Sequence, residues 1–274
     1  MITSCLPDGC YSLLTTLYYF LSPLLSMLHL QTLHTGYANR TVGECLNGHL
    51  PEATVTALIG VNGAGKSTLL RTLMGELPAK AGKVVLNGKD AATYTLKERA
   101  RMMSVVLTHR VEVDSIPVRE VVALGRLPYT PLLGALSETD MDLVDAAMER
   151  LALKSMAHRP IGTLSDGERQ RVMIAKALAQ QTPLILLDEP TAFLDYPTKV
   201  DLLMQLKELA RTHRKTILLS THDLDLALKL VDRLWLLTPE GLTEGTPQEF
   251  AQNGKIDQVF SSPALKFSTQ QVIS

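Results

Sequence analysis

The chain has 274 residues, of which 46% are hydrophobic, so it can bury a sizeable core and is not expected to be disordered. Its 27 basic and 28 acidic residues leave a formal net charge of −1, and no Lys/Arg-rich run is present, which argues against nucleic acid as a partner. Cys5, Cys10 and Cys45 are odd in number and lack metal-ligand spacing, so they are interpreted as free thiols rather than a disulfide framework.

The first stretch differs in composition from the rest of the chain. After Asp8 no charged residue occurs until Arg40. Pro23 and many hydroxyl side chains interrupt the stretch, and no Lys or Arg precedes it, so it fits neither a membrane helix nor a signal peptide. We interpret residues 1–26 as a non-native or disordered extension from an upstream start, with Met27 as the biological start. Intact-mass measurement of the native protein tests this, and a mature chain beginning at residue 1 contradicts it.

The next part of the chain predicts mixed β-structure with an antiparallel part. Residues 28–37 and 55–59 are typical of strands around a loop that contains Gly, Asn and Pro, and residues 82–88 add a strand that ends in a turn. A short helix is expected over residues 96–102 and a buried strand over 104–107.

The segment after strand 55–59 fits the pattern G-x-x-x-x-G-K-[ST] and precedes a helix. Successive backbone N–H groups and the positive helix end there form a seat for polyphosphate. Lys66 would reach the β- and γ-phosphates, and the Ser67 hydroxyl would ligate Mg²⁺. A chance match occurs in roughly one chain in a hundred of this length, so a nucleoside triphosphate is the predicted ligand. The residues expected to contact it are Gly60, Val61, Asn62, Gly63, Ala64, Gly65, Lys66, Ser67 and Thr68.

The pattern then becomes helical. Apolar residues recur at three-to-four spacing between residues 118 and 157, interrupted by Pro128, Pro131 and Gly134. This predicts a helical subdomain at about residues 110–165, inserted between the phosphate-loop part and the remaining strands.

The remainder alternates helices and strands. Residues 183–187 are an unbroken apolar run typical of a central parallel strand covered on both faces. The alternation predicts an α/β fold with a mainly parallel sheet, in a single domain over residues 27–260 followed by a tail, 261–274. The other expected elements are strands 216–220 and 234–237 and helices 167–180, 199–212, 224–231 and 248–260.

Two carboxylates follow strand 183–187, at the end where open α/β sheets bind ligands. Asp188 would hold Mg²⁺, and Glu189 would orient or deprotonate the attacking water. The alternative is a pair of acids that cap the next helix.

A second short motif opens helix 167–180. Ser165 and Glu168 form an ordinary capping box, which explains both residues. It does not explain Gly167, which suits close approach of an anion to the backbone. This would be a second phosphate-binding helix end, used on nucleotide held by another copy of the chain.

The order of these motifs resembles the nucleotide-binding subunits of ABC transporters from about Met27 to Phe260, which implies a P-loop NTPase of ABC type. The resemblance implies a head-to-tail dimer in which Ser165 and Gly167 of one subunit close on ATP bound to Lys66 of the other.

The same resemblance assigns three further residues. Tyr37 lies where such proteins stack an aromatic ring on adenine, and Asp195, after Leu194, lies in the loop that communicates across the dimer. His222 matches the histidine that senses the γ-phosphate, although from the sequence alone it could be a turn histidine.

A finer resemblance concerns the segment from Val118 to Tyr129, with Gly125-Arg126-Leu127-Pro128 in it. It is similar to the ATPases of importers for iron-siderophores, haem and cobalamin, and Asp166 is frequent in that group. This implies a membrane permease as partner, indirect work with a solute-binding protein, and a peripheral place on the cytoplasmic face of the inner membrane. The alternative for the segment is an amphipathic helix and a Pro turn.

One departure from the family pattern falls at Thr108, where a Gln that touches Mg²⁺ and the attacking water is expected. Thr108 has a shorter stem, so we expect it to reach the metal through water, with altered metal dependence or weaker basal turnover. Mg²⁺ titrations of the parent and Thr108→Gln test this, and superimposable curves contradict it.

Three rivals remain open at this point. A soluble ABC ATPase without a permease usually has paired cassettes, coiled coils or basic surfaces, none of which is evident in the sequence. A P-loop small-molecule kinase leaves residues 164–170 and His222 without a purpose. A nucleotide-dependent switch with negligible hydrolysis is distinguished by Glu189→Gln.

Overall fold

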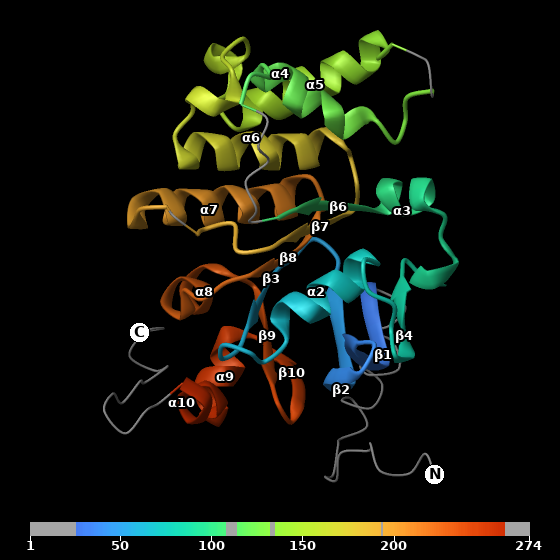
Figure 1. Ribbon diagram of the computed structural model, residues 1–274. Helices are drawn as coiled ribbons and strands as arrows, with labels where there is room; N and C mark the ends of the chain where they lie inside the picture. The colour runs from blue at the N-terminus through green and yellow to red at the C-terminus, as the bar shows by residue number, and fades with distance from the viewer. Residues whose placement is uncertain (1–25, 108–113, 132–134, 193, 261–274) are drawn as a thin grey trace.

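The strands form two sheets in the computed structural model, which describes residues 26–107, 114–131, 135–192 and 194–260 (Figure 1). The larger sheet has the order β10-β9-β3-β8-β7-β6. Its strands from β9 to β6 pair in parallel, whereas β10 pairs antiparallel with β9. The strands are β3 (Val55–Ile59), β6 (Met103–Val106), β7 (Leu184–Leu187), β8 (Thr216–Ser220), β9 (Arg233–Thr238) and β10 (Gly241–Gly245).

The smaller sheet is antiparallel, with the order β2-β1-β4-β5. Its strands are β1 (Ser26–Tyr37), β2 (Arg40–Pro51), β4 (Ala81–Leu86) and β5 (Lys89–Asp90). The predicted α/β fold, with a mainly parallel central sheet and a separate antiparallel part, is therefore confirmed.

The apolar run in β7 is buried on both sides of the sheet. Leu184 and Leu186 pack in a cluster with helix α2 (Lys66–Met74) and strand β1. Ile185 and Leu187 belong to a second cluster, on the opposite face, because successive side chains of a strand point to opposite sides. Each such side chain stabilises the fold by about 1.5–3 kcal/mol relative to exposure.

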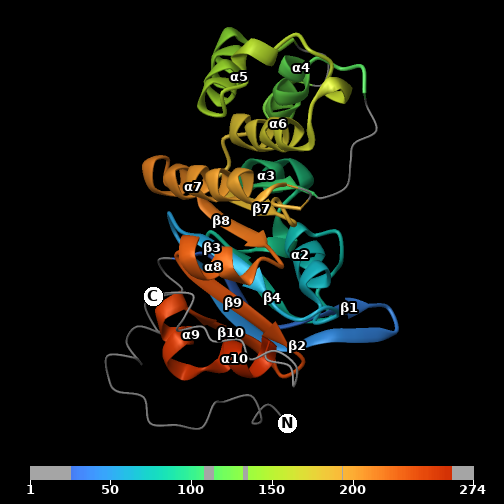
Figure 2. The ribbon, with the colours of Figure 1, turned by 90° about the vertical axis from the view of Figure 1, so that its left-hand side faces the viewer.

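Helices cover both faces of the larger sheet, in layers that two views make clear (Figures 1 and 2). Helix α2 and the smaller sheet lie on one face. Helices α7 (Tyr196–Thr212) and α8 (Leu224–Leu230) lie on the other. Helix α3 (Leu96–Met102) leads into β6 at the edge of the sheet. None of the helices in the described ranges is both long and apolar enough to cross a bilayer.

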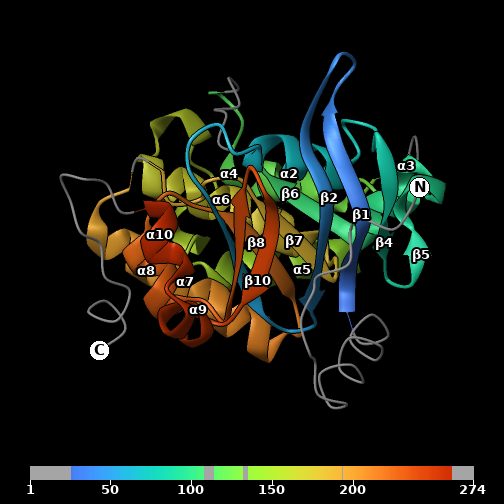
Figure 3. The ribbon, with the colours of Figure 1, turned by 90° about the horizontal axis from the view of Figure 1, so that it is seen from below.

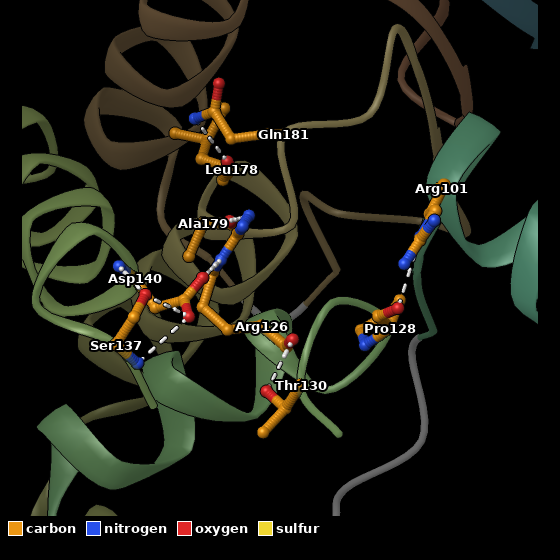
Figure 4. Close-up of polar contacts among 9 residues, drawn as sticks. All are labelled: Arg101, Arg126, Pro128, Thr130, Ser137, Asp140, Leu178, Ala179 and Gln181. Atoms are coloured by element: carbon orange, nitrogen blue, oxygen red, sulfur yellow. Dashed lines mark hydrogen bonds and ion pairs between the residues drawn. The ribbon is translucent and has the colours of Figure 1, made fainter. Parts of the chain in front are cut away.

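The region predicted to be helical contains α4 (Val118–Ala123) and α5 (Glu138–Arg150), which form a layer above α7 (Figure 1). Helix α6 (Asp166–Ala179), which lies beyond the predicted boundary at 165, packs in the same cluster as α4 and α5. The buried Arg126 links α5 to α6. Its Nε donates to Asp140 Oδ1 at 2.8 Å, and its Nη1 donates to Ala179 O at 2.7 Å (Figure 4).

Two expectations about secondary structure are wrong. The loop expected after residue 37 is a full strand, β2, which pairs with β1 through several register shifts. Its sequence lacks regular alternation, and at Gly48 a side chain would meet Leu242 and Trp235, so the glycine serves close packing rather than a turn.

The second wrong expectation concerns the end of the described chain, where one helix was expected after residue 244. The chain there ends β10 and then forms two helices, α9 (Pro247–Asn253) and α10 (Lys255–Phe260). Gly254, with φ 64°, ends α9 and separates the two. The proposed extension and tail lie outside the described residues, apart from Ser26, the first residue of β1.

Candidate active site

The predicted phosphate loop joins β3 to α2. Gly63 and Gly65 have φ values of 81° and 102°, in the left-handed region that glycine adopts at low cost. No side chain caps α2 at Gly65. The N–H groups of its first turn are therefore not committed to a capping side chain, and this suits them to an anion.

Lys66 is the buried cation of the loop, with 8% of its surface exposed. Its Nζ donates to Gly60 O at 2.7 Å and to Val61 O at 3.4 Å. Burial lowers the pKa of Lys66, and the negative charges of Glu189 and Asp188 oppose that shift. The loop lysine and the two carboxylates therefore share one electrostatic environment.

The ends of β7 and β8 are joined through one hydroxyl group. Ser220 Oγ donates to Asp188 Oδ1 at 2.7 Å, and the N–H of Glu189 donates to Ser220 Oγ at 2.8 Å. Asp188 N–H also donates to Val106 O on β6 at 2.9 Å. Ser220 was not predicted as a site residue, although a serine at the carboxyl end of the strand beside β7 was a usable signal.

Glu189 and His222 lie in direct contact, with 2.7 Å between Oε1 and Nε2. The His222 side chain is half exposed and that of Glu189 is 35% exposed, so both are accessible to a ligand. Glu189 has a φ of 48°, which is uncommon for a residue other than glycine. Such strain concentrates at functional sites.

The donors near the loop fit Mg²⁺ by their chemistry. Asp188 offers a carboxylate, and Ser67 offers an exposed hydroxyl in the first turn of α2. Magnesium is usually held by one or two such oxygens together with substrate phosphates and water, rather than by a full protein cage. Within the described ranges, no group of three or more His, Cys, Asp or Glu side chains could hold a metal.

The residues expected to act on a second copy lie apart from the loop. Ser165 and Glu168 form the capping box of α6, with Ser165 N–H donating to Glu168 Oε2 at 2.8 Å. This hydrogen bond is the main cause that lowers the pKa of Glu168. At Gly167 an added Cβ would lie 3.4 Å from Thr198 Cγ2, an ordinary contact, so the surrounding packing leaves room for a Cβ there.

Two other predicted residues also lie at element ends. Asp195 caps α7 and accepts from Thr198 N–H at 3.2 Å, and its hydrogen bonds with Thr198 lower its pKa. Tyr37 ends β1 with 45% of its surface exposed, on a hairpin that projects from the body (Figures 2 and 3). That hairpin reaches the loop, because a side chain at Gly65 would meet Val42 Cγ1. Thr108 lies outside the described residues.

The arrangement defines a class of protein. A strand, a glycine loop and a helix enclose a buried lysine, and two carboxylates follow β7, a parallel strand that is separated from β3 by β8. This is the site of a P-loop nucleoside triphosphatase.

The family follows from comparison with known proteins. Residues 44–192 match the family model described as ABC transporter. The iron(3+)-hydroxamate import ATP-binding protein FhuC of Bacillus subtilis is 36% identical, over 88% of this chain and 90% of its own. The ferric enterobactin transport ATP-binding protein FepC of Escherichia coli is 38% identical, over 84% and 85%. The chain belongs to the ABC transporter family and is one of its ATPase subunits.

A solved structure agrees with this assignment. CbiO1 from Clostridium perfringens, part of the ABC transporter complex CbiONQ, superimposes with a TM-score of 0.75 at 25% identity, covering 85% of this chain and 93% of that one. The expected fold class and the expected ATPase activity are thus confirmed.

Proposed function

We propose that the chain powers import of an iron chelate, a siderophore or haem, or of cobalamin, as the ATP-hydrolysing subunit beneath a membrane permease. The likeness to two ATP-binding proteins named for ferric chelates, each over more than four fifths of both chains, supports this substrate class. The carrying observation for the activity is the contact of Glu189 with His222 beside Asp188 and Lys66.

The residues divide the work of hydrolysis. Residues Gly60–Thr68 bind the phosphates through backbone N–H groups, and the Lys66 ammonium leaves the Gly60 carbonyl to meet them. Asp188 and Ser67 would hold Mg²⁺, which would neutralise phosphate charge. Glu189 accepts the proton of the attacking water, and His222, within hydrogen-bond reach of Glu189, orients that carboxylate and the γ-phosphate.

A head-to-tail dimer completes the site. The start of α6, in the helical layer, contains Ser165, Gly167 and Glu168. The phosphate loop precedes α2, which lies on the other side of the large sheet (Figure 1). Because Gly167 is not required by packing, its lack of a side chain suits close approach of a phosphate held by the second copy. Asp195, exposed at the start of α7, faces the same partner, and Tyr37 stacks on adenine.

The remaining partners are a membrane permease and, indirectly, a solute-binding protein, with the chain peripheral on the cytoplasmic face of the inner membrane. No nucleic acid is involved, as the balanced charge of 27 basic and 28 acidic residues suggests.

Glu189→Gln tests the catalytic assignment, because the amide keeps the shape and loses the base. We expect ATP turnover to fall about 10²- to 10⁴-fold while ATP binding persists, measured by phosphate release and by fluorescent-nucleotide titration. Glu208→Gln, an exposed change on α7, serves as the control. Equal turnover in wild type and Glu189→Gln contradicts the assignment, and failure to hydrolyse ATP in the wild type favours a binding switch.

The transport assignment needs a separate experiment. Proteoliposomes are prepared with the chain, its permease and the matching solute-binding protein. They should take up a radiolabelled ferric siderophore, haem or cobalamin only when ATP is present inside them. Uptake of none of the three contradicts the substrate class.

A further inference from the structure

Ser220 is the last residue of β8 and is 1% exposed. Its hydroxyl hydrogen goes to Asp188 Oδ1 at 2.7 Å, and its oxygen accepts the N–H of Glu189 at 2.8 Å. A hydroxyl has one hydrogen to donate, and here that hydrogen is given to a carboxylate of the active site.

The first of these hydrogen bonds orients a carboxylate without neutralising it. A Lys or Arg partner would compete with a cation for the charge of Asp188, whereas a neutral hydroxyl fixes the position of one oxygen and leaves the negative charge. Outer hydrogen bonds of this kind hold metal-binding carboxylates in place. The hydrogen bond from Ser220 therefore orients the Asp188 carboxylate and leaves it charged for binding a divalent cation.

The second hydrogen bond acts on the backbone of Glu189. The φ of this residue is 48°, in the left-handed region where residues other than glycine are strained. The N–H of Glu189 donates to Ser220, and the side chain of Glu189 contacts His222, which follows Ser220 by two residues. The end of β8 and the residues just after it therefore hold both the backbone and the side chain of Glu189.

We propose that Ser220 is a positioning residue for ATP hydrolysis, which sets the Asp188 carboxylate for the cation and the Glu189 backbone for the attacking water. This inference rests on the proposed roles of Asp188 and Glu189. The competing interpretation is a buried serine that stabilises the sheet alone.

Ser220→Ala removes the hydroxyl with little change of volume, and Ser104→Ala is its matched control. Ser104 is also 1% exposed on the same sheet, on β6, and its hydroxyl accepts from Thr182 Oγ1 at 3.0 Å, away from the site. Ser220→Ala loses two hydrogen bonds and Ser104→Ala loses one. A purely structural role therefore predicts lower thermal stability in both variants, with the larger loss in Ser220→Ala, and no effect on turnover in either.

For Ser220→Ala we expect kcat to fall about 10- to 100-fold, with the KM for ATP changed less than about threefold. The Mg²⁺ concentration for half-maximal rate should rise. Binding of Mn²⁺ in the presence of ADP, followed by electron paramagnetic resonance, should weaken about tenfold or more. Ser220→Thr, which keeps the hydroxyl, should recover much of the kcat and of the Mn²⁺ affinity.

Several outcomes overturn the proposal. One is that Ser220→Ala has the same kcat and the same Mn²⁺ affinity as Ser104→Ala. If Ser220→Ala does not fold, Ser220→Cys, with a weaker donor, must show reduced Mn²⁺ affinity, and unchanged affinity in that variant contradicts the proposal. Glu189→Gln is measured beside them: if it retains full turnover, the proposed function fails, whereas loss in Glu189→Gln with full activity in Ser220→Ala refutes only the role of Ser220.

Discussion

At the scale of single residues, the phosphate loop depends on a lysine that has almost no solvent contact. The Lys66 ammonium donates to the carbonyl of Gly60 at 2.7 Å and to that of Val61 at 3.4 Å, and the residue is buried. Arginine carries the same charge on a larger, planar group that needs a different set of acceptors. Size and shape, and not charge alone, therefore decide what this position accepts.

We expect Lys66→Arg to weaken ATP binding by about tenfold or more, because the guanidinium does not fit the buried position and displaces the loop. Isothermal titration with ATP measures the change. Lys154→Arg, on a side chain that is 58% exposed, is the control and should bind as the wild type does. Equal affinity of Lys66→Arg and wild type contradicts the role of Lys66.

Tyr37 gives a second prediction at this scale. Because Tyr37 is 45% exposed at the end of β1, we expect Tyr37→Ala to raise the KM for ATP about tenfold through lost stacking, and to leave kcat nearly unchanged. Tyr37→Phe keeps the ring and should keep the KM. Steady-state kinetics of the three proteins measures both constants, and a loss in kcat with an unchanged KM argues against stacking.

At the scale of elements, one buried arginine joins the loop after α4 to two helices. Arg126 donates to Asp140 at the start of α5 and to the last carbonyl of α6 (Figure 4). Its Cζ also lies 4.1 Å from the Tyr129 ring centroid. Asp140 also caps α5 with Ser137. The hydrogen bonds of Ser137, followed by those of Arg126, hold the pKa of Asp140 below its usual range.

We expect Arg126→Ala to lower the free energy of unfolding, by an amount near the lower end of the range of about 3–5 kcal/mol. The loss is at the lower end because Asp140 loses its cationic partner but keeps its hydrogen bonds with Ser137. Urea unfolding measures the change in free energy. Arg119→Ala is the control, since its ion pair with Asp145 is partly exposed and should contribute about 0–1 kcal/mol. Equal losses in the two variants contradict the ranking.

At the scale of the whole molecule, the two sheets are joined by a carboxylate that is 15% exposed. Glu244 on β10 accepts from His49 N–H on β2 at 2.8 Å and from Trp235 Nε1 on β9 at 3.2 Å. Burial raises the pKa of Glu244, but the hydrogen bond from the His49 side chain, through Nδ1, and the charge of His49 outweigh it, so the pKa lies below the usual value for a glutamate.

A depressed pKa fixes the sign of the pH dependence. The ionised Glu244 stabilises the fold at neutral pH, and this contribution is lost as the pH falls from the ordinary glutamate pKa through the lower pKa of the folded state. We expect Glu244→Gln to be less stable than wild type at pH 7 and the difference to shrink in acid. Thermal unfolding from pH 7 to pH 3 measures it, with Glu52→Gln as an exposed control. A difference that grows in acid contradicts this assignment.

The sequence allows some of these features to be predicted and not others, for a physical reason. The phosphate loop and the strand before Asp188 are determined by residues that lie close together in the sequence. The loop glycines with the lysine, and the apolar run, each indicate their structure within a few residues. Strand β2 depends on partners elsewhere in the chain, so its glycines indicated a loop. The bonds of Ser220 to Asp188 and Glu189 cross 32 and 31 residues, and only the neighbouring of β7 and β8 brings them together.

The head-to-tail dimer makes a prediction that no single chain can satisfy. Each site needs Lys66 of one copy and Gly167 of the other, so Lys66→Ala and Gly167→Asp should each abolish turnover when pure. Mixed in equal amounts, random pairing makes half of the dimers hybrid, and each hybrid has one intact site of two. Turnover should therefore recover to roughly a quarter of wild type.

This test separates assembly from folding. Each variant alone must unfold at the wild-type temperature, and a double variant carrying both changes should give no recovery when mixed with either single variant. If the mixture of single variants stays inactive while dimers still form by light scattering, the two sites of a dimer act only together. Turnover by pure Gly167→Asp at the wild-type rate contradicts the shared site, because the loop of one copy would then suffice.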